Sequence, residues 1–320
     1  MKSPQFLQLH RPDDRALAAG AAAGLLARPA QVSPKFFYDA LGSRLFDAIT
    51  ELAEYYPTRT EAAIFERHGA AIAQAALAAT GAQPVLVDLG AGNCAKAARL
   101  FGALAPRRYV AVDIAADFLR QSLQQLQQAH PLIAMLGLGL DFSMRLELPA
   151  DTVSGPALVF YPGSSIGNFA PDGALRLLRE AREVAAGGAL LIGADLVKPT
   201  ALLEAAYDDD LGVTAAFNLN LLKHLNRLLG ADFDVRGWRH LACFDAEASR
   251  IEMHLEARGA TTVRWPGGER AFRPGERIHT ENSYKWTPEG FGALLRRAGF
   301  ERLQVWTDPK GWFGVWLACD

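Results

Sequence analysis

The sequence has 320 residues, of which 50% are hydrophobic and 21% are charged, and its formal net charge is -2. This composition is typical of an ordinary soluble globular protein, the length allows a large core, and the lack of a broad positive charge argues against nucleic acid as a partner. Apolar stretches such as 16–26 are too short to span a bilayer, and the N-terminus lacks a signal-peptide pattern. We therefore expect a cytoplasmic protein that does not enter the membrane.

The cysteines and histidines are spread along the chain. Cys94, Cys243 and Cys319 lie far apart, and the 7 histidines form no pair at metal-ligand spacing with them or with each other. The pattern favours free thiols in a reducing compartment, and it supports neither a disulfide framework nor a metal site.

Strand-like and helix-like segments alternate through the first two thirds of the chain. Apolar runs predict strands at 84–89, 108–113, 133–136 with a glycine-broken extension to 141, 157–161 and 189–195. Helical periodicity lies between them at 95–105, 116–129 and 171–185. This alternation predicts a parallel, doubly wound sheet of the Rossmann-like α/β class.

The segment from 199 to 257 differs in character. It is polar and helical, most clearly over 215–229, and becomes strand-like around 250–255. A helix is then predicted from Pro288 to Gly299, followed by strands at 303–307 and 313–318 that flank a turn. The chain therefore reads as a doubly wound domain that is interrupted by an insertion and ends in a hairpin.

A glycine turn follows the first predicted strand, with Gly90 and Gly92 placed before a helix. Such a turn suits either a dinucleotide or S-adenosylmethionine. Asp88 precedes it and could accept the ammonium of an amino-acid cofactor, whereas a pyrophosphate needs no carboxylate there. Asp113 ends the second strand and could bind ribose hydroxyls, while Asp141 and Phe142 could bind adenine. The pattern favours S-adenosylmethionine; NAD and a purely structural turn remain alternatives.

Several longer runs carry a more specific signal. In chain order they are 36–47, 54–61, 164–168, 193–198, 206–209, 212–218, 231–234, 250–253 and 280–285. Together they resemble the histidine N-α-methyltransferase family of ergothioneine biosynthesis, over about residues 30 to 320. The resemblance implies a class I methyltransferase domain at 60–197 plus 287–320, and a smaller α+β substrate-binding domain at 1–59 plus 198–286, with histidine bound between them.

The resemblance also implies roles for individual residues. One group of residues matches the family's S-adenosylmethionine contacts, and it includes the glycines of the turn and the position near methyl transfer. These residues are Gly90, Gly92, Lys96, Asp113, Asp141, Phe142 and Gly163. Those that match its histidine contacts are Tyr55, Asn168, Tyr207, Met253, Glu281 and Ser283, and Tyr38 is the candidate catalytic residue.

Some of these residues also admit ordinary structural roles. Glu281 and Ser283 are two apart on a predicted strand, so both would face one side and could read the two nitrogens of an imidazole; alternatively, that side faces solvent. Asn168 could be a helix N-cap, Lys96 a surface charge, and Met253 or Tyr55 core packing.

The expected reaction is transfer of up to three methyl groups to the α-amino group of L-histidine. Its mono- and dimethyl forms would also be substrates, and we expect a monomer that needs no metal. The alternatives are a methyltransferase of the same fold for another amino acid and a catalytically silent S-adenosylmethionine-binding module. Departures from some family members at Asn282, Tyr284 and Trp286 leave the number of methyl groups open.

Overall fold

The computed structural model describes residues 2–9 and 14–320, which form two compact units. Unit 1 comprises Met1–His10, Pro57–Val197 and Tyr284–Asp320, and unit 2 comprises Arg11–Tyr56 and Lys198–Ser283. Each unit is thus built from segments that are distant in the sequence. Within the described part of the chain, no helix is both long and apolar enough to cross a membrane.

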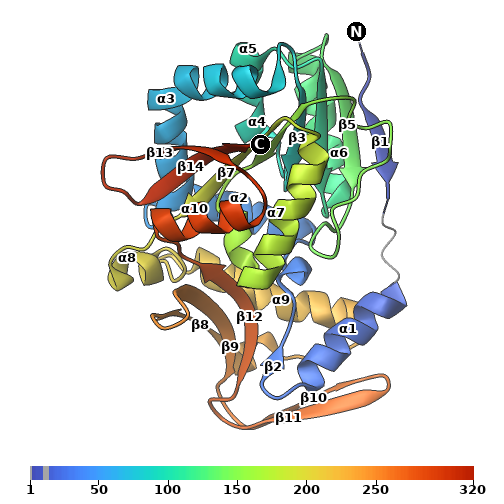
Figure 1. Ribbon diagram of the computed structural model, residues 1–320. Helices are drawn as coiled ribbons and strands as arrows, with labels where there is room; N and C mark the ends of the chain where they lie inside the picture. The colour runs from blue at the N-terminus through green and yellow to red at the C-terminus, as the bar shows by residue number, and fades with distance from the viewer. Residues whose placement is uncertain (1, 10–13) are drawn as a thin grey trace. The chain divides into compact units, whose positions relative to one another are not determined.

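Unit 1 contains an 8-stranded sheet in the order β1-β5-β4-β3-β6-β7-β14-β13 (Figure 1). Its strands are β1 (Gln5–Gln8), β3 (Val85–Leu89), β4 (Arg108–Asp113), β5 (Ala134–Gly139), β6 (Ala157–Tyr161), β7 (Ala189–Asp195), β13 (Arg302–Thr307) and β14 (Phe313–Cys319). The pairs from β1 to β7 are parallel, and β14 is antiparallel to both β7 and β13. The predicted Rossmann-like α/β fold is confirmed, and the strand order reverses at β3.

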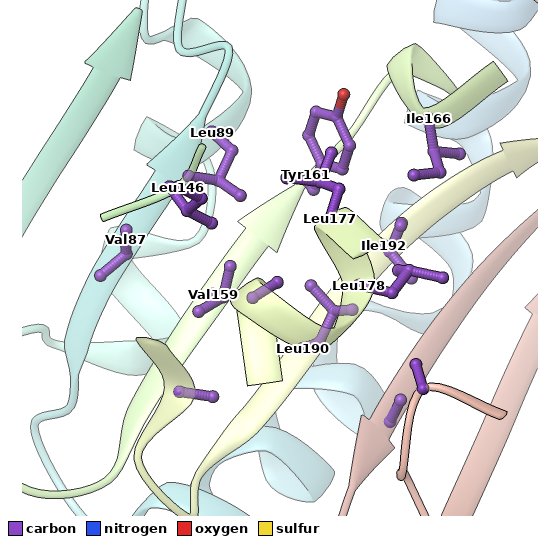
Figure 2. Packing of buried hydrophobic residues seen from close by; sticks show 14 of the residues in the cluster. Val87, Leu89, Leu146, Val159, Tyr161, Ile166, Leu177, Leu178, Leu190 and Ile192 are labelled. Carbon is purple, nitrogen blue, oxygen red and sulfur yellow. The ribbon is translucent and has the colours of Figure 1, made fainter. Parts of the chain in front are cut away.

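Helices cover both faces of this sheet. On one face, α7 (Pro171–Ala185) and α10 (Pro288–Arg297) bury leucines and phenylalanines against β3, β6 and β7. Figure 2 shows Leu177 and Leu178 of α7 in this layer with Val159, Leu190 and Ile192. The other face is covered by α3 (Tyr56–Thr80), α4 (Ala95–Ala98), α5 (Phe101–Leu104) and α6 (Ala116–Ala129).

Two details of unit 1 differ from the sequence predictions. The helix predicted over 95–105 is divided into α4 and α5, because the Leu100 N–H bonds to the Ala97 oxygen in a 3₁₀-type turn between them. Residues 5–8 form edge strand β1 of the large sheet, so the assignment of all of 1–59 to the substrate domain is wrong there. Gly137 of β5 makes room for this strand, since a Cβ on it would lie 2.6 Å from the Phe6 ring.

Unit 2 combines a 4-stranded sheet, order β2-β12-β9-β8, with a separate hairpin, β10-β11. The strands are β2 (Ala30–Gln31), β8 (Trp238–Asp245), β9 (Arg250–Ala257), β10 (Thr261–Trp265), β11 (Gly268–Phe272) and β12 (Arg277–Tyr284). Its helices include α1 (Asp14–Leu26), α2 (Ala40–Thr50), α8 (Thr200–Ala205) and α9 (Val213–Leu229). The predicted helical insertion and its change to strand near residue 250 are confirmed, whereas β8, β10 and β11 were not predicted.

A buried ion pair lies in unit 1 at the end of β7. The Lys285 ammonium is 3.0 Å from the Asp195 carboxylate, and their side chains are 0% and 1% exposed. The backbone at this point is also bonded, since the Trp286 N–H donates to the Asp195 oxygen and the Val197 N–H donates to the Trp286 oxygen. The pair therefore joins the last residues of β7 to the segment that re-enters unit 1.

We expect Lys285→Met to lower the free energy of unfolding by about 3–5 kcal/mol, because it removes the cation that balances a buried carboxylate. The double variant Asp195→Asn/Lys285→Met should be less destabilised than the single one, since it buries no uncompensated charge. Urea unfolding followed by circular dichroism measures both. A loss below about 1 kcal/mol in Lys285→Met would show that the Asp195 carboxylate does not depend on the Lys285 ammonium to balance its charge.

Candidate functional site

The glycine turn after β3 is fixed by the end of the neighbouring strand. Gly90 and Gly92 have φ of 68° and 51°, in the region that favours glycine. The Gly90 N–H donates to the Val112 oxygen at 2.9 Å, and the Gly92 N–H donates to Asp113 Oδ2 at 2.8 Å. Asp113 Oδ1 accepts from the Ala115 N–H at 2.8 Å. Asp113 therefore orders two turns while each oxygen keeps a lone pair for a further donor.

The end of β5 contributes a carboxylate and an aromatic ring next to this turn. Asp141 is buried, and its Oδ1 accepts from the Ser143 N–H at 3.1 Å. The Phe142 ring packs edge-on against Tyr161, with 5.9 Å between ring centroids, and a Cβ on Gly90 would lie 3.9 Å from its Cζ. Gly90, Asp113 and Phe142 thus meet at the carboxyl edge of the sheet, where α/β proteins bind ligands.

Lys96 and Gly163 are joined by a residue to which sequence reasoning gave no role. Glu61 of α3 accepts from Lys96 Nζ at 2.7 Å through Oε2 and from the Gly163 N–H at 2.8 Å through Oε1. Gly163 has φ of 79°, and a Cβ on it would lie 2.9 Å from Lys96 Nζ. Lys96 is therefore not simply a charge on the surface, since it is paired with a buried carboxylate. In the sequence, only the position of Glu61 within the run 54–61 pointed to a role for it.

Asp88 is buried at the end of β3, where its Oδ2 accepts from the Tyr109 hydroxyl at 2.7 Å. Its Oδ1 is buried without a hydrogen-bond partner among the described residues. Burial raises the pKa of Asp88 from 3.8 to about 7, and the charges of Asp113 and Glu61 act in the same direction. One oxygen of Asp88 thus accepts no hydrogen bond from the described residues, and its role toward a cofactor ammonium stays a prediction.

In unit 2, a chain of aromatic contacts links the residues predicted to bind the amino acid. The Tyr207 hydroxyl and Ser283 Oγ are 2.7 Å apart, and the Tyr55 and Tyr207 rings meet at 6.3 Å. Phe46 contacts Tyr55 at 6.3 Å and Tyr38 at 5.9 Å. Unit 2 therefore brings Tyr38, Tyr55, Tyr207 and Ser283 into one continuous cluster.

The predicted imidazole-binding residues lie on two adjacent strands of unit 2. Glu281 and Ser283 of β12 are 7% and 3% exposed, so the alternative that they face solvent is wrong. Met253 of β9 is buried, and its carbonyl accepts from Thr280 Oγ1 at 3.0 Å. A carboxylate and a hydroxyl are thus held two residues apart in a protected part of the sheet.

Asn168 stands apart from the other predicted substrate residues because it belongs to unit 1. It is the last residue of the 3₁₀ helix Ser165–Asn168 after β6, and the N-cap of α7 is Ala170. The alternative that Asn168 caps α7 is therefore wrong. All of the predicted cofactor residues lie in unit 1 as well.

Comparison with known proteins decides the family. Residues 17–319 match the family described as histidine-specific, S-adenosylmethionine-dependent methyltransferases. The chain belongs to this family. It is 43% identical to the histidine N-alpha-methyltransferase of Mycolicibacterium smegmatis and 40% identical to that of Mycobacterium tuberculosis, each over 95% of this chain and 94% of the relative. It is 30% identical to ergothioneine biosynthesis protein 1 of Neurospora crassa, over 87% of this chain and 32% of that protein.

The residues of unit 1 fit the methyl donor of this family. The Asp88 oxygen without a partner suits an ammonium, and the Asp113 carboxylate retains acceptor capacity for hydroxyls. The positive φ angles of Gly90 and Gly92 let the backbone approach a ligand closely. The hydrogen-bond acceptors present in unit 1 are thus of the kinds that the ammonium and the ribose of S-adenosylmethionine need.

Unit 2 also contains a group of side chains of metal-ligand type that the sequence analysis did not anticipate. Among the residues described, Cys243, Glu252 and His254 place ligand atoms within 4.8 Å of one another. Cys243 pairs with Glu252 across β8 and β9, which spacing along the chain cannot show. Glu252 accepts from Arg250 and from His254 Nε2, at 2.9 Å for the latter. A metal cation there would compete with the Arg250 guanidinium for the Glu252 carboxylate. We therefore interpret the group as a charged hydrogen-bond network.

The raised pKa of Asp88 predicts a particular dependence of stability on pH. Between pH 4 and 8 this carboxyl ionises more readily in the unfolded chain than in the folded one, so Asp88 lowers the free energy of unfolding as the pH rises. We expect Asp88→Asn, which can still accept from Tyr109, to raise that free energy by about 1–3 kcal/mol at pH 8 and to change it little at pH 4. Urea unfolding without ligand at both pH values measures the difference. Equal pH dependence of the two proteins would show that Asp88 ionises normally.

Proposed function

We propose that this enzyme transfers three methyl groups in succession from S-adenosylmethionine to the α-amino nitrogen of L-histidine. The product is the trimethylated betaine of histidine, and the reaction is the first step of ergothioneine biosynthesis. The observation that carries the substrate assignment is the buried pair Glu281 and Ser283 on one strand, of which Ser283 is hydrogen-bonded to Tyr207. The names of the relatives, histidine N-alpha-methyltransferase and ergothioneine biosynthesis protein 1, support it.

Glu281 and Ser283 can read the two nitrogens of an imidazole ring. The carboxylate of Glu281 accepts from one ring N–H, and the Ser283 hydroxyl serves the other nitrogen as donor or acceptor. The Tyr207 hydroxyl shares one hydrogen bond with Ser283 and so fixes its rotation. Met253 adds an apolar contact from the neighbouring strand. A ring without two polar nitrogens would make neither the bond to Glu281 nor the bond to Ser283, which gives selectivity against other amino acids.

The backbone of the substrate is assigned to the amide of Asn168 and the hydroxyls of Tyr55 and Tyr207. These groups hold the carboxylate and amine so that the nitrogen lone pair is aligned for in-line attack, which is a task of positioning. Tyr55 and Tyr207 are buried, so water is largely excluded around their hydroxyls.

The cofactor supplies a methyl group that is already activated by a positively charged sulfur. In unit 1, Asp113 binds its ribose, Asp141 and Phe142 its adenine, and Asp88 and Lys96 its amino-acid end, while Gly90, Gly92 and Gly163 admit the ligand. Displacement at such a methyl group requires no Lewis acid, so we propose a metal-free reaction. We further propose a cytoplasmic monomer with no nucleic-acid partner, in line with the net charge of -2.

The amine must lose a proton before it can attack, because an ammonium has no lone pair. We assign this step to the Tyr38 hydroxyl, which accepts the proton of the amine while it releases its own proton to solvent, and which lies at the end of the aromatic cluster of unit 2. Packing of its ring against Phe46 and Phe217 holds the side chain in one place.

The test of the substrate is mass spectrometry of products formed with S-adenosylmethionine and, separately, histidine, its mono- and dimethyl forms, tryptophan and tyrosine. We expect gains of up to three methyl groups on histidine and correspondingly fewer on its mono- and dimethyl forms, and no gain on tryptophan or tyrosine. Glu281→Gln should raise KM for histidine by about 10-fold or more, since it replaces an ionised acceptor. Methylation of another amino acid would overturn the imidazole assignment, and no methylation at all would favour a silent binding module.

Tyr38→Phe tests the proton assignment separately. The ring and its packing remain, so we expect the affinity for histidine, measured by calorimetry, to change less than about 3-fold. The kcat at neutral pH should fall by about 10²-fold, the lower range for loss of a general base. The loss should shrink at high pH, where more of the amine is already deprotonated. An unchanged kcat would assign deprotonation to solvent.

A further inference from the structure

Glu61 is a buried carboxylate at the start of α3 whose two oxygens serve two different segments of unit 1. Its side chain is 2% exposed, Oε2 bonds Lys96 of α4, and Oε1 bonds the backbone of Gly163 after β6. We propose that Glu61 is a positioning residue for the cofactor, acting through Lys96 and the Gly163 turn. The proposal rests on the proposed function in one respect, namely that the amino-acid end of S-adenosylmethionine contacts Lys96.

The residues around Glu61 leave space for both members of the ion pair with Lys96. A Cβ on Gly163 would lie 2.9 Å from the Lys96 ammonium, and a Cβ on Gly193 would lie 2.3 Å from Glu61 Oε1. Glycine at 163 therefore makes room for the cation, and glycine at 193 makes room for the carboxylate. The turn after β6 and strand β7 are thus adapted to the same ion pair.

The exposed fractions of the two side chains indicate that the position of Lys96 depends on Glu61. The Lys96 side chain is 37% exposed and sits on a helix of only 4 residues, so alone it would sample many rotamers in water. The Glu61 carboxylate is fixed by burial and by the Gly163 amide, and it holds the ammonium in one position. An ammonium has three donors, so Lys96 can bond Glu61 and still bond a ligand carboxylate.

The charges around the glycine turn match a zwitterion. Asp88 carries a buried oxygen without a partner, and its pKa responds to the charges of both Lys96 and Glu61, so the three groups share one electrostatic environment. The α-ammonium of the cofactor suits Asp88, and its α-carboxylate suits the outer donors of Lys96. Glu61 thus determines where the carboxylate can bind.

The test is the binding of S-adenosylhomocysteine by calorimetry, because this molecule keeps the amino-acid end and needs no turnover. Glu61→Gln keeps the size of the side chain and the acceptor for Gly163 but loses the charge. We expect its Kd to rise about tenfold, with a matching rise in KM for S-adenosylmethionine. The kcat and the KM for histidine should change less than about twofold. Glu66→Gln, an exposed position on the same helix, is the matched control and should bind normally.

A double-mutant cycle separates positioning from a general loss of structure. Lys96→Met should weaken binding, and adding Glu61→Gln to it should cause no further loss, because both variants remove the same interaction. An unchanged Kd in Glu61→Gln, or losses that multiply in the double variant, would overturn the proposal. If Glu61→Gln does not fold, Glu61→Asp replaces it, since its shorter side chain cannot reach both partners. If the enzyme did not methylate histidine, the proposed function would be contradicted, but the double-mutant cycle could still be measured because it follows only the binding of S-adenosylhomocysteine.

Discussion

The contact between Asp113 and the glycine turn is the constraint on which the cofactor side of this enzyme depends. The turn leaves β3 with two residues at positive φ, a conformation that would not persist by itself in so glycine-rich a segment. Backbone bonds to Val112 and the side-chain bond from Gly92 to Asp113 tie it to the end of β4. Because the strand order reverses at β3, these two strand ends border the crevice where α/β sheets bind ligands. One carboxylate thus shapes the turn and keeps acceptor capacity for a further donor.

Unit 2 holds several tyrosines in an aromatic setting. The rings of Phe46 in α2 and Phe217 in α9 pack against the Tyr38 ring, and the Tyr55 ring packs against Phe46 and Tyr207. The hydroxyl of Tyr207 is fixed by Ser283, so its orientation is set before any ligand arrives. Groups oriented in advance lose little entropy on binding, and this suits the role that we propose for Tyr207 and Ser283 in binding the substrate.

The sequence predicted those parts of the fold in which each segment carries its own signal. Strands β3, β4, β6 and β7 are buried on both sides and read as continuous apolar runs, so their positions were found almost to the residue. Strand β1 has only four residues, largely exposed, and β8 has a mixed pattern at the edge of its sheet, so neither could be recognised locally. The site showed the same division. Asp113 followed from its place at a strand end, whereas Glu61 acts on residues 35 and 102 positions away.

Two buried carboxyls of unit 1 show how neighbouring acids acquire different properties. Glu61 faces an ammonium and a backbone N–H, which compensate its charge within the protein. Asp88 has only the Tyr109 hydroxyl, and its second oxygen has no partner among the described residues, so its charge is not compensated and its pKa rises to about 7. A ligand ammonium would supply the missing cation. The fold therefore carries an electrostatic cost at Asp88 in the absence of ligand, and binding of a cationic group is favoured to the extent that it removes this cost.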